Sequence, residues 1–249
     1  MATVKSSGTG YNHQASFKRI DSILAAPDGN FPQRDDLPPR DDLTFDNGFF
    51  VRVAAMFVDI RKSSDLPAKY TEPALAKLYR AFISEVVAVL DGSSDCDEIN
   101  IVGDGVWGVF HARLKSQVDR VVESAAKVST LIDGLNARLE HNGYERLRVG
   151  IGLDWGRALM IKTGFYGSGV NDVVYLGNVV NRAAKLCSFG EQKLGYAYRP
   201  RIMAGREIVS NLESTKYAAF FSCDASIGCY TASLQNTTMT DWLTQNPPT

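Results

Sequence analysis

The order of hydrophobic patterns along this sequence predicts an α+β fold of the split βαβ, or ferredoxin-like, type. Short apolar runs rich in Val and Ile indicate buried strands, and longer stretches with apolar residues at helical spacing indicate helices. The predicted elements follow one another as β-α-β-β-α-β, over residues 51–58, 71–92, 99–102, 106–110, 114–142 and 146–154. Because many unrelated activities share such a fold, the order of elements alone decides no function.

The two ends of the chain differ from this core. We expect an N-terminal extension over residues 1–47, with a short amphipathic helix at 14–24 and then a Pro- and Asp-rich linker. The main domain is expected over residues 48–234, and residues 235–249 are expected to form a loose polar tail.

Further elements are predicted after the last core strand. Trp155 and Gly156 are expected to turn the chain, so that residues 157–162 return as a separate strand. The remaining predictions are a Gly-rich loop, a helix, a short strand, a short helix and a C-terminal β-hairpin, over residues 163–174, 178–188, 202–204, 206–212, and 217–221 with 227–234.

Composition excludes several classes of function. The chain has 249 residues, of which 45% are hydrophobic and 22% charged, as in ordinary globular proteins. A net charge of −1 gives no bulk attraction to nucleic acid or to an anionic membrane. The four cysteines have no metal or redox spacing, and no apolar run approaches the roughly 20 residues of a membrane span. We therefore expect a cytoplasmic protein that binds neither nucleic acid nor membrane.

A carboxylate follows the first predicted strand at a position that suits a metal ion. Residues 51–58 are almost unbroken apolar, and the run ends at Asp59, where a buried strand opens into a loop. Lys62, Ser63 and Ser64 follow, so the carboxylate faces the small-residue start of the next element. This placement suits a divalent metal that carries phosphates, although a solvent-facing Asp has the same local pattern.

A second carboxylate makes the metal interpretation more specific. Asp104 stands in a Gly-Asp-Gly turn between two apolar runs, which is a strong signal for a hairpin because glycine accepts positive φ. If this hairpin pairs beside the first strand, Asp59 and Asp104 can share two Mg²⁺ or Mn²⁺ ions. Paired carboxylates of this kind serve phosphoryl and nucleotidyl transfer.

Four motifs in this order resemble those of the class III nucleotide cyclases. Phe57–Ile60 and Val102–Gly105 resemble the two segments that carry the family's metal-binding carboxylates. Arg148–Gly152 is similar to the family's Arg-hydrophobic-Gly-Ile strand, and Leu176–Leu186 is similar to its Asn-bearing helix. The resemblance spans residues 51–234 and implies a class III cyclase catalytic domain with the ferredoxin-like core.

The resemblance implies a two-metal reaction. Asp59, Asp104 and the backbone carbonyl of Ile60 would hold two ions, Mn²⁺ or Mg²⁺. In the family, one ion activates the ribose 3′-OH and the other holds the triphosphate. The 3′-oxygen then attacks the α-phosphorus in line, and pyrophosphate leaves.

The resemblance also implies a set of substrate-binding and catalytic residues. Asn181 would orient the ribose, and Lys185 would stabilise charge on the α-phosphate, with Arg182 one turn back as a possible assistant. In the family, each site takes its metal ligands from one subunit and this helix from the other, so a homodimer with shared sites is expected. Backbone amides would hold phosphates near Arg61, Lys62, Ser63 and Ser64.

Three positions depart from the purine cyclases of the family. The purine-reading Lys is replaced by Asn100, the second base-reading residue by Val174, and the transition-state Arg by Lys185, which keeps the charge but loses the bidentate fork. This pattern resembles the pyrimidine cyclases of Pycsar anti-phage systems, which make cyclic UMP or cyclic CMP for a separate effector protein. UTP is expected as substrate on that resemblance, with CTP left open because the Asn100 amide suits either base edge.

Other functions remain as alternatives. The chain could be an adenylate or guanylate cyclase, or a silent cyclase domain that binds a nucleotide as a regulatory or sensor module. Polymerase palm domains and diguanylate cyclases share the carboxylate pair, but the Asn181 helix favours the class III interpretation and no Gly-Gly-Glu/Asp-Glu-Phe motif is present. Turnover with a cyclic product separates an enzyme from a sensor.

Overall fold

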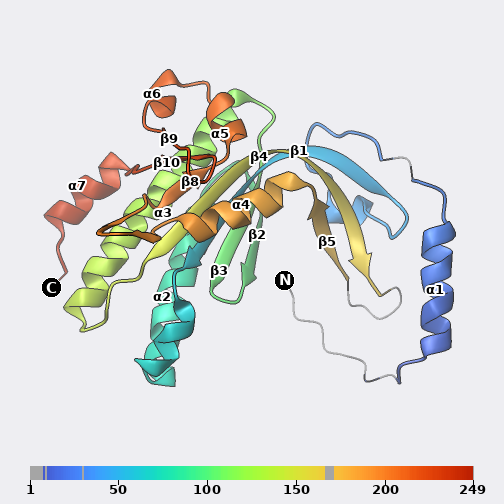
Figure 1. Ribbon diagram of the computed structural model, residues 1–249, viewed down its shortest axis with the longest axis horizontal. Helices are drawn as coiled ribbons and strands as arrows, with labels where there is room; N and C mark the ends of the chain where they lie inside the picture. Colours follow the sequence, from blue (N-terminus) through green and yellow to red (C-terminus); the bar gives the residue numbers. More distant parts are fainter. Residues whose placement is uncertain (1–7, 9, 30, 166–170, 249) are drawn as a thin grey trace. The chain divides into compact units, whose positions relative to one another are not determined.

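The structure is a computed structural model that describes residues 8, 10–29, 31–165 and 171–248. It divides into two compact units (Figure 1). The first comprises residues 1–51 and 158–177, and the second comprises residues 52–157 and 178–249. Every residue of the site described below, Val174 apart, belongs to the second unit.

Among the described residues, one eight-stranded sheet has the order β2-β3-β1-β4-β8-β10-β9, with β5 paired to β4. The element order β1-α2-β2-β3-α3-β4 confirms the predicted βαββαβ core. The strands of this sheet are β1 (Gly48–Ile60), β2 (Cys96–Val102), β3 (Gly105–His111), β4 (Val149–Gly164), β5 (Asn171–Leu176), β8 (Ile202–Ala204), β9 (Ser222–Asp224) and β10 (Cys229–Ala232).

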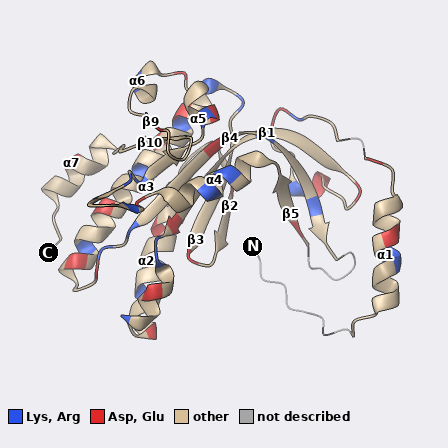
Figure 2. Ribbon diagram, viewed as in Figure 1, with Lys and Arg blue, Asp and Glu red and all other residues tan. Residues whose placement is uncertain are grey.

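Helices and short elements complete the chain. A small separate hairpin consists of β6 (Lys193–Leu194) and β7 (Ala197–Tyr198). The helices are α1 (His13–Ala25), η1 (Arg40–Asp42), η2 (Ser63–Ala68), α2 (Glu72–Asp91), α3 (Lys115–His141), α4 (Asn178–Phe189), α5 (Arg206–Ser210), α6 (Thr215–Ala218) and α7 (Thr237–Gln245). Positive and negative side chains both occur along α2 and α3, whereas α4 carries only positive ones (Figure 2).

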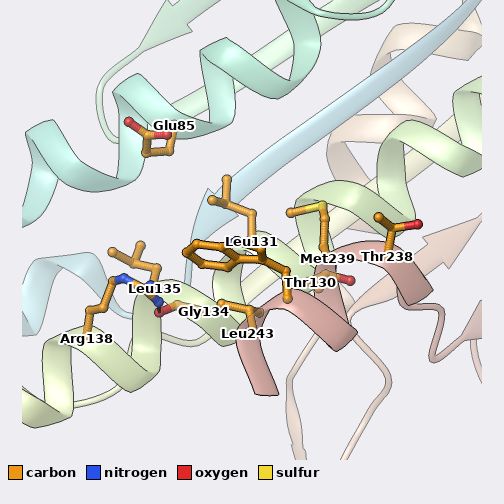
Figure 3. Close-up of a pocket in the computed structure, with 10 residues that line it drawn as sticks. Glu85, Thr130, Leu131, Gly134, Leu135, Arg138, Thr238, Met239 and Leu243 are labelled. Carbon is orange, nitrogen blue, oxygen red and sulfur yellow. Dashed lines mark hydrogen bonds between the residues drawn. The ribbon is translucent and has the colours of Figure 1, made fainter. Parts of the chain in front are cut away.

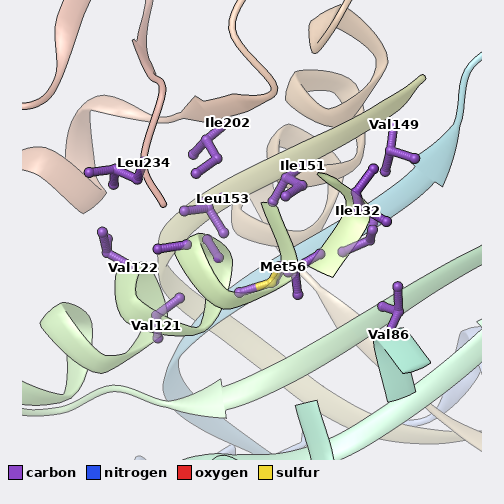
Figure 4. Close-up of a cluster of buried hydrophobic side chains, with 14 of the residues drawn as sticks. Met56, Val86, Val121, Val122, Ile132, Val149, Ile151, Leu153, Ile202 and Leu234 are labelled. Carbon is purple, nitrogen blue, oxygen red and sulfur yellow. The ribbon is translucent and has the colours of Figure 1, made fainter. Parts of the chain in front are cut away.

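The hydrophobic core lies between one face of the sheet and helices α2 and α3. Alternate residues of β1, such as Met56 and Val58, point into it, because successive side chains of a strand face opposite sides. Figure 4 shows Met56 among Val86 of α2, Ile132 of α3 and Ile151 of β4. The other set of alternate residues, including Phe57 and Asp59, is thereby directed to the opposite face of the sheet.

Helix α4 packs closely on β4 because two glycines leave room for its backbone. A Cβ built on Gly150 would lie 2.1 Å from the carbonyl oxygen of Cys187. A Cβ on Gly152 would lie 2.0 Å from the carbonyl oxygen of Ala183. Any side chain at either position would push α4 off the strand, so these glycines set the place of the helix.

In the first unit, helix α1 confirms the predicted amphipathic helix. Its apolar residues Phe17, Ile20 and Leu24 are all exposed. The linker that follows contacts the rest of this unit at two points. Gln33 forms an isolated β-bridge with Phe50, and the Arg40 guanidinium donates a hydrogen bond to Asp172 of β5 at 2.7 Å.

Two predictions between β4 and α4 are wrong. Trp155 and Gly156 do not turn the chain, because β4 runs unbroken from Val149 to Gly164. Gly156 has no positive φ, and the Trp155 indole donates to the backbone oxygen of Ala112 at 2.6 Å. The predicted Gly-rich loop at 163–174 is largely strand, since β4 ends at Gly164 and β5 begins at Asn171; residues 166–170 lie outside the described residues.

Near the C-terminus, the predicted hairpin exists but its first strand is displaced. Tyr217 lies in helix α6, and the strand that pairs with β10 is β9, Ser222–Asp224. The segment expected as a loose tail contains helix α7, which Asn236 caps by accepting from the backbone N–H of Met239. This helix packs on α3, where Leu243 fills the space above Gly134.

Candidate active site

Two carboxylates meet where β1 ends. Asp59 is the penultimate residue of β1, and Asp104 stands in the turn that joins β2 to β3, with Gly103 at φ 62°. Strand β3 pairs antiparallel with β1, which brings the turn beside the end of β1. Burial raises the pKa of Asp59, and the charge of Asp104 and a hydrogen bond to it raise that pKa further. The two acidic groups therefore share one site, as the sequence predicts.

The turn leaves space for the first carboxylate. A Cβ on Gly105 would lie 3.2 Å from Oδ1 of Asp59, so a larger residue there would crowd the pair. Oδ2 of Asp104 is buried and has no hydrogen-bond partner among the residues that the structure describes. An unpaired buried carboxylate oxygen beside a second carboxylate is a position that a cation would satisfy.

The donor set fits a hard divalent ion that also binds substrate. No cluster of three or more His, Cys, Asp or Glu residues suited to a metal occurs in the described part of the chain. Two carboxylates without further side-chain ligands suit Mg²⁺ or Mn²⁺, which commonly take one or two carboxylates together with phosphate oxygens and water. The main-chain ligand that the motif resemblance implies for such an ion is the carbonyl of Ile60, the residue after Asp59 and the last of β1.

Arg61 lies between the carboxylate pair and helix α4. Its guanidinium is 2.6 Å from Oδ2 of Asp59 and donates to the backbone oxygen of Ser188 at 3.0 Å. The positive charge of Arg61 lowers the pKa of Asp59, against the larger effects of burial and Asp104. Only 14% of the Arg61 side chain is exposed, so this contact is held within the protein.

A pocket rich in cations opens beside Arg61. Its volume is about 420 Å³. Arg61, Lys62, Arg148 and Lys193 line it, whereas its one carboxylate, Glu191, is already bonded to the backbone N–H of Val149 and to Arg201. The pocket therefore carries excess positive charge, and its Arg61 contacts Asp59, an arrangement that suits a polyphosphate accompanied by cations.

Helix α4 carries the three polar residues that the sequence predicts there. Asn181 and Lys185, one turn apart, are exposed. Arg182 is exposed as well, with 44% of its side chain accessible, and its Nε lies 3.4 Å from Oδ2 of Asp154 on β4. Arg182 therefore differs from the other two in forming an ion pair within its own chain.

The sheet face that carries Asp59 also carries two stacked aromatic rings. Phe57 and Trp107 face each other across β1 and β3, with ring centroids 5.1 Å apart and an interplanar angle of 2°. Asn100 lies opposite Trp107 in the β2–β3 register, so all three side chains belong to one face. Asn100 is almost fully buried, at 4% exposure.

Comparison with known proteins decides the family. Residues 48–196 match the model of the adenylate and guanylate cyclase catalytic domain. The chain belongs to this family, the class III nucleotide cyclases. It is therefore a nucleotidyl cyclase by family. The fold and the family membership that its motifs predict are both confirmed.

Two curated relatives of this cyclase are named uridylate cyclase. One, from Gulbenkiania mobilis, is 41% identical over 191 residues, which cover 74% of each chain. The other, from Treponema porcinum, is 35% identical over 182 residues, which cover 73% of this chain and 63% of the relative. Among solved structures, the guanylyl cyclase Cya2 is similar in fold, with a TM-score of 0.59 and 14% identity over 76% of this chain and 95% of that one.

The remaining predicted site residues of the cyclase lie as follows. Lys62 has a left-handed backbone with φ 56°, and Ser63 and Ser64 begin helix η2 directly after it. Val174 lies on β5 opposite Ile161 of β4, in the first unit. The roles of these residues in substrate binding stay predictions.

Sequence reasoning missed four residues of the cyclase site. Trp107 carries no site signal of its own in the sequence, yet its ring lies with Phe57 on the sheet face opposite the core. Arg148 stands in the sequence only as part of a strand motif, and Lys193 and Asp154 belong to no recognisable site motif. The alternation of β3 places Trp107 and Gly105 on one face, so that signal was available; the others depend on contacts between distant segments.

A separate apolar cavity lies between α2, α3 and α7 of the cyclase (Figure 3). Its volume is about 520 Å³, and Leu131, Leu135 and Met239 are among its lining residues. None of the predicted site residues lines it. In the described part of the chain, no helix has the length and hydrophobicity to cross a membrane.

Proposed function

We propose that this cyclase converts UTP to 3′,5′-cyclic UMP and pyrophosphate. The observation that carries the reaction type is the meeting of Asp59 and Asp104 beside a pocket lined by cations. The choice of base is supported by the two relatives named uridylate cyclase, at 41% and 35% identity. The cyclase domain is taken as residues 48–234, between an N-terminal extension and a C-terminal segment.

Class III cyclases generally use divalent metals, and this site would hold two Mn²⁺ or Mg²⁺ ions through Asp59, Asp104 and the carbonyl of Ile60. Bound there, the ions would supply the charge that activates the ribose 3′-OH and neutralises the departing pyrophosphate. Both carboxylates must be ionised to act as ligands. Because the pKa of Asp59 is raised, binding of the ions should weaken as the pH falls into the acid range.

The chain's own cations would bind the triphosphate. Arg61, Lys62, Arg148 and Lys193 line one pocket, and each can donate to non-bridging phosphate oxygens. The first N–H groups of η2, at Ser63 and Ser64, would add neutral donors, because a helix start leaves such groups without partners in the helix. Together these groups would align the α-phosphorus for in-line attack.

Helix α4 would complete the site of a second subunit. Class III cyclase domains often dimerise, and Asn181 and Lys185 are exposed on α4 as a contact across a dimer requires. Asn181 would orient the ribose and Lys185 would stabilise charge on the α-phosphate. We therefore propose a homodimer with two sites, each built from both chains.

The base would lie against the sheet face that carries the stacked rings. Phe57 and Trp107 fill space on this face, which favours the smaller pyrimidine over a purine. Asn100, buried beside Trp107, would read the base edge through its amide, and Val174 would contribute shape only. Because the Asn100 amide can present its donor and acceptor in either order, CTP is the second candidate substrate.

We propose that the product, cyclic UMP, acts as a second messenger in the cytoplasm. The resemblance to the pyrimidine cyclases of Pycsar systems supports a function in anti-phage defence, in which cyclic UMP activates a separate effector protein. Phage challenge of cells that express the cyclase together with an effector activated by cyclic UMP tests this role. Equal phage titres with the wild-type and Asp59→Ala proteins would contradict it.

A four-nucleotide competition assay tests the activity. The purified protein is incubated with equal ATP, GTP, CTP and UTP and with Mn²⁺, and products are identified by mass. Cyclic UMP as the main product supports the proposal, whereas cyclic CMP as the main product would identify CTP as the preferred substrate. Saturable nucleotide binding without pyrophosphate release would identify a silent binding module instead.

A further inference from the structure

A buried carboxylate lies behind helix α4, outside the metal-binding pair. Asp154, on β4, is 1% exposed, and its Oδ2 lies 3.4 Å from Nε of Arg182. Its other oxygen, Oδ1, has no hydrogen-bond partner within the described residues. Burial raises the pKa of Asp154 to about 6, although the charge of Arg182 acts in the opposite direction.

The fold reserves space for this carboxylate. A Cβ on Gly205, the residue before α5, would lie 2.0 Å from Oδ1 of Asp154 and 3.3 Å from an amino group of Arg182. A side chain at Gly205 would displace the acid and disturb its partner. The backbone N–H of Gly205 is itself fixed, since it donates to the oxygen of Leu153 at 2.8 Å.

Stability alone does not account for Asp154. Asp154 is paired with a partly exposed guanidinium and accepts a backbone hydrogen bond from Trp155, yet burial still raises its pKa. A buried carboxylate of this kind can cost more in lost hydration than its partners return, and a neutral group of the same shape is often as stable or more so. What the pair does provide is a directional link between β4 and the first turns of α4. Gly152 sets the distance of α4 from the strand, and the ion pair of Asp154 with Arg182 favours one rotation of the helix about its axis.

That rotation decides where the proposed catalytic residues point. Asn181 precedes Arg182 directly, and Lys185 lies one turn further along. Because neighbouring residues of a helix are separated by a fixed angle of about 100°, the direction that the ion pair gives to Arg182 also sets the directions of Asn181, about 100° away, and of Lys185, about 60° away. A change in rotation would move both groups together.

We propose that Asp154 is a positioning residue that acts through Arg182 to present Asn181 and Lys185 to the nucleotide. This inference rests on the proposed function, and it assigns the α-phosphate contact to Lys185, because Arg182 is engaged with Asp154 in its own chain. Neither Asp154 nor Arg182 touches the substrate.

The first test is the Asp154→Asn variant, which keeps the shape and can still bond to Arg182 as a neutral acceptor. We expect kcat for UTP to fall at least tenfold while KM stays within about twofold, because the groups that bind triphosphate are unchanged. The melting temperature should stay the same or rise. Glu145→Gln, which removes an exposed ion pair with Lys69, is the matched control and should change neither kcat nor melting temperature.

A purely structural role gives a different result. In that case the melting temperature of Asp154→Asn would fall together with its activity, and a kcat within twofold of wild type would equally overturn the proposal. Arg182→Gln should lower kcat to a similar extent. The double variant should be no worse than either single one, because the two residues act as one unit; additive losses would contradict the link.

Mixed dimers separate this inference from the proposed function. The control mixes Asp59→Ala with Asn181→Ala protomers, and recovered activity shows that sites are shared. If so, Asp59→Ala mixed with Asp154→Asn should also recover activity, whereas Asn181→Ala mixed with Asp154→Asn should not, because both defects then lie on α4. Recovery in the last mixture overturns the inference; failure of the control overturns the shared site instead, and the kinetics of Asp154→Asn still decide its role.

Discussion

The guanidinium of Arg61 lies 2.6 Å from the carboxylate of Asp59, two residues earlier in the chain. The same side chain donates to the backbone oxygen of Ser188, at the end of α4. Arg61 therefore neutralises one of the two proposed metal ligands and joins it to the helix that carries Asn181. It also lines the cation-rich pocket, so one residue contacts three parts of the candidate site.

Replacing Arg61 should move the acid limb of the pH profile. Arg61 lowers the pKa of Asp59, whose pKa is otherwise raised by burial and by Asp104. In Arg61→Gln that pKa rises further, so Asp59 becomes protonated at higher pH and activity is lost earlier as pH falls. Loss of a charged hydrogen bond of about 1.5–3 kcal/mol should also lower kcat/KM for UTP by roughly 10- to 100-fold at neutral pH.

The measurement is kcat/KM for UTP with Mn²⁺ across the acid range. Arg146→Gln provides the control, because Arg146 forms an exposed pair with Glu140. The control should keep the wild-type profile. An acid limb in Arg61→Gln that coincides with wild type would show that Arg61 does not act on Asp59.

Removing either carboxylate of the pair should abolish turnover without unfolding the protein. In Asp59→Asn and Asp104→Asn the shape is kept, but a hard divalent ion loses a charged ligand. Two like charges at close range repel, so the melting temperature without metal should stay level or rise. Calorimetric titration with Mn²⁺ and circular dichroism melting measure the two effects. Near-full activity in either variant would remove the two-metal assignment.

Asp154→Asn should change the pH dependence of stability in a defined direction. The folded-state pKa of Asp154, about 6, lies above its ordinary value of 3.8, so folding disfavours the charged form. Wild-type stability attributable to this group is therefore highest below pH 4, falls as pH rises to about 6, and is constant above. Two pKa units correspond to about 3 kcal/mol, an upper bound on the gain from Asn at neutral pH.

Urea unfolding of both proteins between pH 4 and 8 provides the check. The difference in free energy of unfolding between Asp154→Asn and wild type should grow from pH 4 to 6 and then level off. Taking this difference cancels the contributions of the titratable groups that both proteins share. A difference that does not vary with pH would mean that Asp154 has no raised pKa in the folded protein.

Gly152→Ala should displace α4 and destabilise the protein. The added Cβ would lie 2.0 Å from the backbone oxygen of Ala183 and 2.2 Å from the backbone nitrogen of Cys187, so the helix must move. Overpacking of this kind costs about 1–3 kcal/mol or more. Gly156→Ala, on the same strand, is the matched control, because its nearest contact would be Val179 at an ordinary 3.7 Å.

Both variants are compared by urea unfolding and by turnover of UTP. The loss of stability and activity in Gly152→Ala should exceed that in Gly156→Ala clearly. Equal effects would mean that close packing of α4 on β4 is not what the glycine provides.

Local signals predicted the carboxylate pair, whereas long-range contacts defined the rest. The strand end at Asp59 and the Gly-Asp-Gly turn at Asp104 are both visible within a few residues. The turn expected at Trp155 was wrong because Gly156 has no positive φ and β4 continues, with its first half paired to β8 and its second half to β5. No local pattern could show this change of partner.

The C-terminal helix and the buried ion pair illustrate two other limits. Helix α7 has a weak but readable signal, with apolar residues at Met239, Trp242 and Leu243, but its stability depends on packing against α3. The pair of Asp154 with Arg182 joins β4 to α4, and only the tertiary structure brings such residues together. Sequence order therefore predicted the core βαββαβ fold well and the contacts behind α4 poorly.

Asn100→Lys should weaken the use of pyrimidine nucleotides. Asn100 is buried opposite Trp107, on the sheet face that carries Asp59, and its amide can donate and accept toward a base edge. Lys has donors only and a longer side chain, so the acceptor is lost and the space beside Trp107 shrinks. We expect at least a tenfold fall in kcat/KM for UTP, with a smaller change for ATP.

Ile101→Lys is the control: Ile101 is the next residue, is 48% exposed, and points to the other face of β2. The four-nucleotide competition assay compares both variants with wild type, and an unchanged product ratio in Asn100→Lys would exclude Asn100 from base recognition.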